Sequence, residues 1–178
     1  MPRERLVTMA VRLNHTIAAA RDKQASATFL TEVLGLPPPS LLGPFAVVEV
    51  GDTSLDYADA DGDITPQHYA FLVSEAEFDE IFGRIRERRL RYWADPFRRE
   101  PDRINAWDDG RGVYFDDPNG HLLEIITRPY GSGGTAAANP HPLVAQRLDP
   151  AAREGSGPGR PGEGGGGALA RSERPDGR

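Results

Sequence analysis

Cysteine is missing from this chain of 178 residues. Its absence excludes disulfide bonds, thiolate nucleophiles and zinc sites with cysteine ligands. Long apolar runs are missing too, and none approaches the roughly 20 residues that a membrane-spanning helix requires. Because residues 1–6 also lack the apolar core of a signal peptide, the sequence predicts a cytoplasmic protein without a membrane partner.

Basic residues are fewer than acidic residues. The chain carries 21 Lys and Arg residues against 27 Asp and Glu residues, a formal net charge of −6. Binding of nucleic acid regardless of its sequence relies on cations that neutralise phosphates. The charge therefore argues against a nucleic-acid partner, and a small molecule is the expected ligand.

Large apolar side chains are scarce in the carboxyl-terminal part of the chain. Residues 131–178 contain twelve Gly and six Pro. Such a segment cannot bury enough apolar surface to offset the entropy lost on ordering. We therefore predict a disordered tail over 131–178, with His141 solvated inside it, and one compact domain over 8–130.

A hairpin is expected near the end of that domain. Asp117-Pro-Asn-Gly120 is strong turn chemistry between two runs rich in β-formers. The second run carries Glu124 among apolar neighbours on both faces. A buried acid costs several kcal/mol unless it is paired or binds a metal. Tyr114, on the first run, is either a core tyrosine or a hydrogen-bond donor to an oxygen bound near a metal.

Two histidines also lie in strand-like runs. His15 belongs to the run 9–18, and His68 opens the run 68–73. They are 53 residues apart, and Glu124 follows His68 by a further 56, so the spacing alone proves nothing. Two histidines and one carboxylate suit a borderline divalent metal with positions left open for substrate. The alternative is that each histidine is a hydrogen-bonded core residue.

The order of predicted elements repeats weakly along the chain. A helix is expected from an N-cap at Asp22 to Gly35, and a second one begins with the capping-box pattern at Ser74. The second helix has apolar residues at helical spacing, namely Phe78, Ile81, Phe82 and Ile85. Strands precede and follow each helix, which indicates two similar modules at about 8–60 and 66–129.

Three segments resemble the vicinal oxygen chelate superfamily, which includes glyoxalase I, extradiol dioxygenases, fosfomycin-resistance enzymes and bleomycin-binding proteins. They are Asn14-His15-Thr16 with the helix that follows it, Gln67-His68-Tyr-Ala-Phe71, and Phe115-Asp-Asp-Pro-Asn-Gly-His-Leu-Leu-Glu124. They occur in the expected order. The resemblance implies an α+β fold in which two βαβββ modules form a single open-barrel cleft. It also implies a frequent homodimer, with modules paired within or across chains.

Carried over by position, the resemblance implies His15, His68 and Glu124 as ligands of one divalent metal ion, either Fe, Mn, Zn, Ni or Co. Asp56 stands where glyoxalase-like members carry a further glutamate ligand. Its hairpin is offset by one residue from that of Glu124, and a slip of one residue turns a side chain to the other face. Asp56 is therefore a ligand or general base, or else a solvated acid. Strand alternation puts His121 opposite Glu124, so we leave it out of the ligand set.

A loop rich in arginine and aromatic residues precedes the final hairpin. It holds Arg98, Arg99 and Arg103 together with Phe97 and Trp107. Loops carry specificity on rigid scaffolds, so this one is a candidate site for an anionic or planar substrate. The alternative is a surface loop that packs on its own aromatics.

The sequence thus supports two functions. The first is a metal-dependent enzyme, which is a lyase, an isomerase or a ring-cleaving dioxygenase. Two adjacent oxygens of the substrate would chelate the metal. The catalytic candidates are Glu124, Tyr114 and Asp56. The second is a metal-free protein that sequesters a drug or metabolite.

Overall fold

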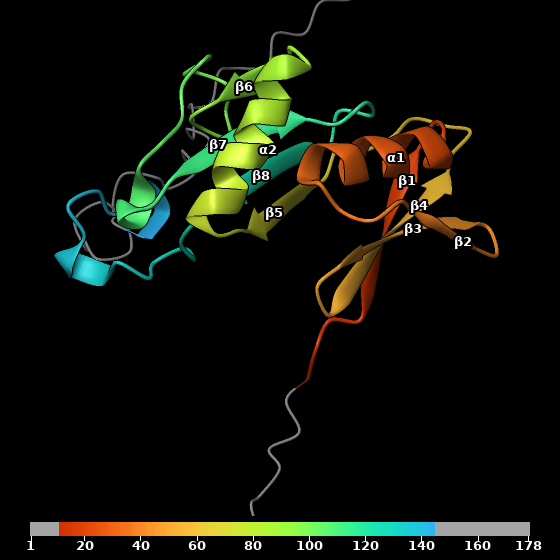
Figure 1. Ribbon diagram of the computed structural model, residues 1–178, viewed down its shortest axis with the longest axis horizontal. Coiled ribbons are helices and arrows are strands. Elements are labelled where there is room, and N and C mark those ends of the chain that lie inside the picture. Colours follow the sequence, from red (N-terminus) through yellow and green to blue (C-terminus); the bar gives the residue numbers. More distant parts are fainter. Residues whose placement is uncertain (1–10, 145–178) are drawn as a thin grey trace, which may run out of the picture.

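The computed structural model describes residues 11–144, which form two modules side by side (Figure 1). Each module is a strand, a helix and three further strands. The first comprises β1 (His15–Ala20), α1 (Lys23–Leu34), β2 (Ser40–Leu42), β3 (Phe45–Val50) and β4 (Thr53–Asp59). The second comprises β5 (His68–Leu72), α2 (Glu75–Glu87), β6 (Tyr92–Trp93), β7 (Gly112–Asp116) and β8 (Leu122–Ile126), with short 3₁₀ turns at Trp107–Asp109 and Gly134–Ala136.

The two sheets have the same topology. Their strand orders are β1-β4-β3-β2 and β5-β8-β7-β6, and in each the first strand runs parallel to the last while the other pairs are antiparallel. The predicted α+β fold of two βαβββ modules is therefore confirmed.

Both helices begin where the sequence predicts. The Asp22 side chain accepts a hydrogen bond from the Ala25 amide at 2.9 Å, and Gly35 ends α1 with a positive φ of 74°. Ser74 and Glu77 form the expected capping box at the start of α2. Neither helix within residues 11–144 is long and apolar enough to cross a membrane.

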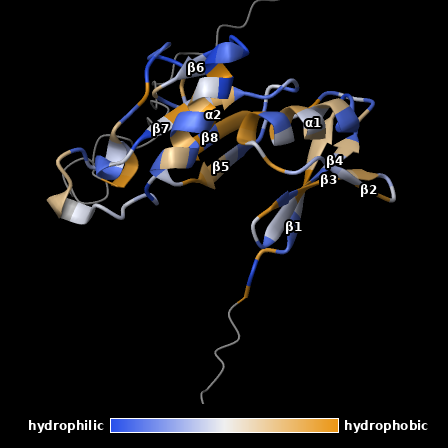
Figure 2. Cartoon of the chain, viewed as in Figure 1, coloured by the Kyte–Doolittle hydropathy of each residue, from blue (hydrophilic) through white to orange (hydrophobic). Residues whose placement is uncertain are grey.

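One hydrophobic core joins the modules. It contains buried side chains from both helices and both sheets, among them Leu30, Tyr57, Phe78 and Ile125. Figure 2 shows hydrophobic residues running through β5 and β8 beneath α2. Because the core is shared, the two modules are packed in a fixed arrangement.

His121 forms hydrogen bonds to both modules. Its Nδ1 accepts a hydrogen bond from the Gln67 amide at 3.0 Å, which leaves Nε2–H to donate to the Ala19 carbonyl at 2.8 Å. Next to it, the Asn119 side chain accepts from the Arg21 amide at 3.0 Å. Both nitrogens of His121 are thus occupied, which agrees with its omission from the metal ligands.

The predicted tail begins too early in the chain. Residues 131–144 fold back onto the second module, and His141 is 2% exposed rather than solvated. Asp108 accepts the Gly131 amide at 2.7 Å, and Asp109 accepts the Ala138 and Asn139 amides at 3.0 Å each. These carboxylates satisfy backbone groups that a Gly-rich segment cannot pair by itself. The rest of the predicted tail, 145–178, lies outside the described residues.

Arg111 joins β7 to the start of α2 and yields a stability prediction. It donates to Glu75 at 2.6 Å and to Asp79 at 2.5 Å, and its guanidinium lies over the Phe78 ring. Thr127 and then Arg111 lower the pKa of Glu75, and Arg111 lowers that of Asp79. We expect Arg111→Gln to lower the melting temperature at neutral pH, because both acids then lose their cation.

A group whose pKa is depressed by folding stabilises the protein above its unfolded pKa, here about 4. The gap between wild type and Arg111→Gln should therefore be widest at pH 6–8 and close as the pH falls towards about 3. Thermal melts across this range measure it. Arg103→Gln, which removes a more exposed arginine 3.7 Å from Glu100, is the control and should change little. A gap that is independent of pH would contradict the electrostatic explanation.

Candidate functional site

The second module brings His68 and Glu124 together. They lie on neighbouring parallel strands, where His68 pairs with Leu122 and Ala70 pairs with Glu124. The His68 Nε2 atom is 3.3 Å from Glu124 Oε2. Glu124 is 0% exposed, whereas 43% of the His68 side chain is exposed. A buried carboxylate thus meets an accessible imidazole at the edge of a cavity.

The hydrogen bonds of His68 define which of its nitrogens is free. Its Nδ1 lies 3.0 Å from the Leu122 carbonyl, which can only accept, so Nδ1 carries a proton. In the neutral ring, Nε2 then presents a lone pair towards the carboxylate. Glu124 raises the pKa of His68, because a proton on Nε2 relieves the contact between two electron-rich atoms. A metal cation bound at Nε2 would relieve the same contact. Metal-binding histidines usually donate their other ring N–H to an acceptor, as Nδ1–H of His68 does.

Glu124 itself has an unsatisfied oxygen. Oε2 accepts the hydroxyl of Tyr130, but Oε1 is buried and has no hydrogen-bond partner among the described residues. Buried carboxylate oxygens are expensive to leave unpaired. The orphaned oxygen fits a ligand to a divalent cation.

Tyr114 reaches the carboxylate through Tyr130. Since the Tyr130 proton is used on Glu124, the Tyr114 hydroxyl donates to the Tyr130 oxygen at 2.9 Å. Burial, together with Glu124, raises the pKa of both phenols, so they remain proton donors at neutral pH. The Tyr114 ring also stacks beside that of His68, with centroids 5.9 Å apart. Two tyrosines therefore orient the candidate ligands.

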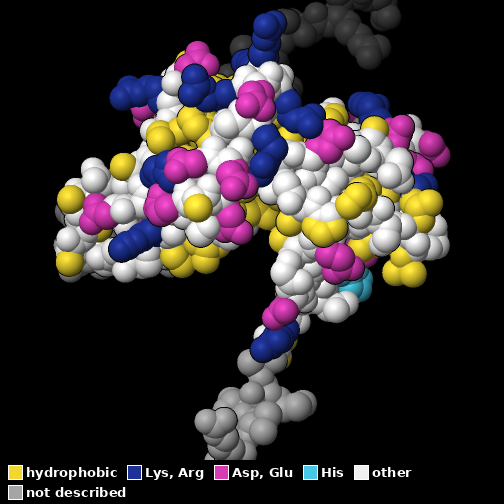
Figure 3. Space-filling view, in the orientation of Figure 1, with side chains coloured by type: hydrophobic (Ala, Val, Ile, Leu, Met, Phe, Trp, Pro, Cys, Tyr) yellow, Lys and Arg dark blue, Asp and Glu magenta, His cyan; other side chains and the backbone are white. Residues whose placement is uncertain are grey.

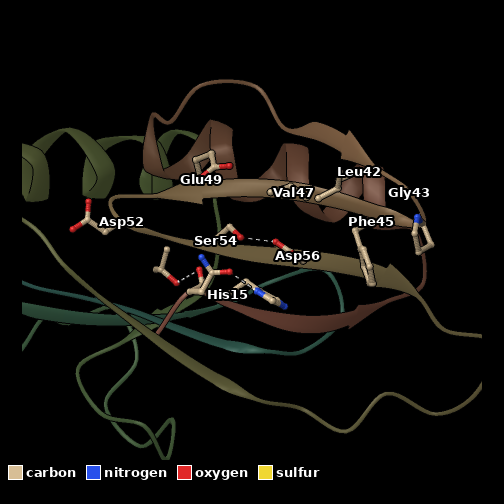
Figure 4. A pocket seen from close by; sticks show the side chains of 12 residues that line it. His15, Leu42, Gly43, Phe45, Val47, Glu49, Asp52, Ser54 and Asp56 are labelled. Carbon is tan, nitrogen blue, oxygen red and sulfur yellow. Dashed lines mark hydrogen bonds between the residues drawn. The ribbon is translucent and has the colours of Figure 1, made fainter. Parts of the chain in front are cut away.

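The first module carries a matching half of a site. His15 Nδ1–H donates to the Asn14 side-chain oxygen at 2.8 Å, so its Nε2 is free in the neutral ring. Asp56 is buried and accepts from the Ser54 hydroxyl at 2.7 Å. Figure 4 shows His15 and Asp56 together in one hollow beside Phe45. As neither His15 nor His68 is buried, the reading of both as core histidines does not hold.

The register of the two sheets shows on which face of its sheet Asp56 lies. In the first sheet His15 pairs with Ser54 and Ile17 with Asp56, and in the second His68 pairs with Leu122 and Ala70 with Glu124. Asp56 is therefore the positional counterpart of Glu124. It shares the face of His15, opposite the core residues Leu55 and Tyr57. The offset arises in the loops: two residues separate β3 from β4, and 117–121 separate β7 from β8.

The two halves do not meet within the chain. His15 and Asp56 line a hollow of about 600 Å³ that is formed by the first module. His68 lines a cavity of about 380 Å³ formed by the second module and the segment after it. No group of three or more metal-binding side chains lies together within residues 11–144. Two of the three predicted ligands are thus adjacent, and His15 stands on the other module.

The second-module cavity has aromatic walls. It is lined by His68, Phe97, Arg99, Trp107, Tyr114, Tyr130 and His141, together with neighbouring residues of the same loops. Phe97 is 68% exposed at the rim of the cavity, whereas Trp93 is buried in the protein. Arg98 is paired with Asp116 at 2.6 Å, and Arg103 lies near Glu100. Of the predicted arginines, Arg99 is the one that lines the cavity.

The sequence pattern does not predict Tyr130 and His141 as site residues, because it places Tyr130 at the end of the domain and His141 in the tail. One signal pointed to Tyr130. It is six residues beyond Glu124, so an alternating strand pattern continued through Arg128 puts it on the same face. No comparable signal marks His141, whose position depends on the anchoring of its segment by Asp108 and Asp109.

Comparison with known proteins agrees with this architecture. The sequence model of the glyoxalase/bleomycin resistance protein/dioxygenase superfamily matches residues 12–125. The glutathione transferase FosA of Serratia marcescens is 32% identical over 120 residues, which cover 64% of this chain and 78% of that protein.

Two solved structures are much closer in sequence. The oxidase ChaP-H1 is 61% identical and superposes with a TM-score of 0.68 over 69% of this chain and all of that chain. The oxidase ChaP-H2 is 65% identical, with a TM-score of 0.69 over 71% of this chain and all of that chain. The chain therefore belongs to the glyoxalase/bleomycin resistance protein/dioxygenase superfamily.

Proposed function

We propose that the protein is a metal-dependent oxidase or oxygenase that acts on a small molecule with two adjacent oxygen atoms. His68 and Glu124 of one chain and His15 of a second copy would hold the metal. The observation that carries the proposal is the His68–Glu124 pair, in which a free imidazole nitrogen faces a buried carboxylate at 3.3 Å. The orphaned Glu124 Oε1 supports it.

A second copy is needed because the shared core fixes the two modules of one chain relative to each other. His15 lies on a face that also exposes Ile17, which is 48% accessible. Figure 3 shows further hydrophobic side chains exposed on the first module near β2, where Leu41 and Leu42 are 69% and 65% accessible. Exposed apolar side chains of this kind favour an interface. A two-fold dimer that covers them would seat the first module of each chain on the second module of the other, making two sites.

The names of the relatives support one of the chemistries that fit such a site. Two proteins called oxidases are 61% and 65% identical to this chain, whereas the glutathione transferase is 32% identical. Two histidines and one carboxylate that leave positions open also suit Fe(II) and dioxygen chemistry. Bound iron would supply Lewis acidity and a route for electrons to dioxygen. Oxidation is therefore favoured over isomerase or lyase chemistry.

The remaining polar side chains have roles around the substrate. Tyr130 and Tyr114 hold the Glu124 carboxylate and keep protons available beside it. Asp56 would enter the same site from the second copy, because it shares the face of His15. Its position there suits a general base for a substrate hydroxyl or a fourth ligand. The aromatic walls of the cavity suit a flat ring.

Metal content tests the proposal directly. The untagged protein is purified without oxygen, and its metal is measured by elemental mass spectrometry for wild type, His68→Ala and the control Arg103→Gln. We expect about one divalent ion per chain in wild type and control, and a loss of at least about tenfold in His68→Ala.

Iron would direct the assay to oxidation, and zinc, nickel, cobalt or manganese to isomerase or lyase chemistry. A wild type that takes up no metal, even after reconstitution, would overturn the enzyme proposal and favour the sequestering protein.

A further inference from the structure

His141 lies in the wall of the second-module cavity although it is 17 residues beyond Glu124 in the sequence. It is 2% exposed. Its ring sits between two aromatic neighbours, with centroids 4.1 Å from Tyr130 and 4.7 Å from Trp107. The imidazole is thus held by packing and has little freedom to turn.

One nitrogen of His141 is satisfied and the other is not. Nδ1 lies 3.2 Å from the Leu143 amide and accepts its hydrogen, so in the neutral ring Nε2 carries the proton. Burial lowers the pKa of His141, which keeps the ring neutral. Nε2 is buried and has no partner among the described residues. A buried donor without an acceptor is costly, and such groups are often completed by a ligand.

The cavity supplies the setting for that ligand. The Trp107 and Tyr114 rings meet edge to face at 6.2 Å, and the exposed Phe97 adds a third aromatic surface at the rim. The same cavity is lined by His68 and by Tyr130, whose hydroxyl donates to Glu124. A flat molecule whose oxygens point towards His68 has its ring among the aromatics and its edge near His141.

We propose that His141 is a ligand-binding residue whose Nε2–H donates a hydrogen bond to an oxygen of an aromatic molecule bound in the second-module cavity. The inference rests on the proposed function for the direction in which the ligand oxygens point. It extends the site beyond residues 12–125, the part that matches the superfamily. Asp108 and Asp109 serve it indirectly, since they anchor the segment that carries His141.

Binding of 4-nitrocatechol, a coloured aromatic with adjacent hydroxyls, tests the proposal. Full-length protein loaded with metal is titrated, and binding is followed by the colour of the probe and by tryptophan fluorescence. We expect His141→Phe, which keeps an aromatic ring, to weaken binding about tenfold, as loss of one hydrogen bond predicts. His141→Gln restores a donor and should recover affinity to within about threefold of wild type. Ser132→Ala, in the same segment but outside the cavity wall, is the control and should bind as wild type does.

Metal content and melting temperature are measured on every sample, so that folding and the metal site are followed separately. Unchanged affinity in His141→Phe with metal retained would overturn the role of His141. So would a wild type that holds metal but does not bind 4-nitrocatechol. If His141→Phe fails to fold, loss of the recovery expected in His141→Gln overturns it instead. A wild type that takes up no metal even after reconstitution, but binds the probe through His141, would overturn the proposed function and leave this inference standing.

Discussion

Mixing His15→Ala chains with Glu124→Gln chains should restore metal sites that neither chain has alone. In the proposed dimer each site takes His15 from one chain and His68 and Glu124 from the other. Random pairing gives about half mixed dimers, each with one intact site and one doubly defective site, so about a quarter of all sites should be functional. If all three ligands came from one chain, no intact site would form in any mixture.

The measurement is metal content after the two variants are expressed together and purified as dimers. A mixture of His68→Ala and Glu124→Gln is the matched control, because both residues lie on the second module and no pairing yields an intact site. A monomer by light scattering, or a mixture as empty as its components, would contradict the shared site. Oxidation activity in the same samples should follow the metal.

The physical argument that identified Glu124 depends on local sequence alone. An acid flanked by apolar residues on both faces must be buried, and Glu124 is 0% exposed with His68 beside it. The helix ends were predictable for the same reason, since Asp22, Gly35 and Ser74 act on their own backbone neighbours. Features that depend on a few adjacent residues were therefore the ones the sequence could specify.

Features that depend on contacts between residues far apart in the sequence could not be predicted in this way. The side on which Asp56 lies is decided by loop length and by its register against β1, neither of which the offset between hairpins reveals. The placement of His15 apart from His68 depends on how the modules share a core. The average composition of residues 131–178 predicts a solvated His141, whereas the first part of that segment is held by Asp108 and Asp109.

Glu124→Gln should abolish metal binding without harming the metal-free fold. The amide keeps the volume of the side chain. With its oxygen in the place of Oε2 it still accepts the Tyr130 hydroxyl, and its N–H₂ group takes the place of Oε1, which has no partner among the described residues. It removes a buried charge, which costs several kcal/mol when it is not fully paired. In the presence of a chelator, the melting temperature of the variant should therefore equal or exceed that of wild type.

Added metal should separate the two proteins. Binding to the native state alone raises stability in proportion to the logarithm of ligand concentration over Kd. Wild type should gain stability on titration with Fe(II), while Glu124→Gln, with an affinity at least about 100-fold lower, should gain almost none at the same concentration. Glu87→Gln, an exposed acid on α2, is the control and should behave as wild type does. A variant that melts well below wild type in chelator would make Glu124 a structural residue, and one that still gains stability with metal would remove it from the ligand set. The expected pair of results, a more stable fold and a lost site, is what a side chain retained for binding at the expense of stability should give.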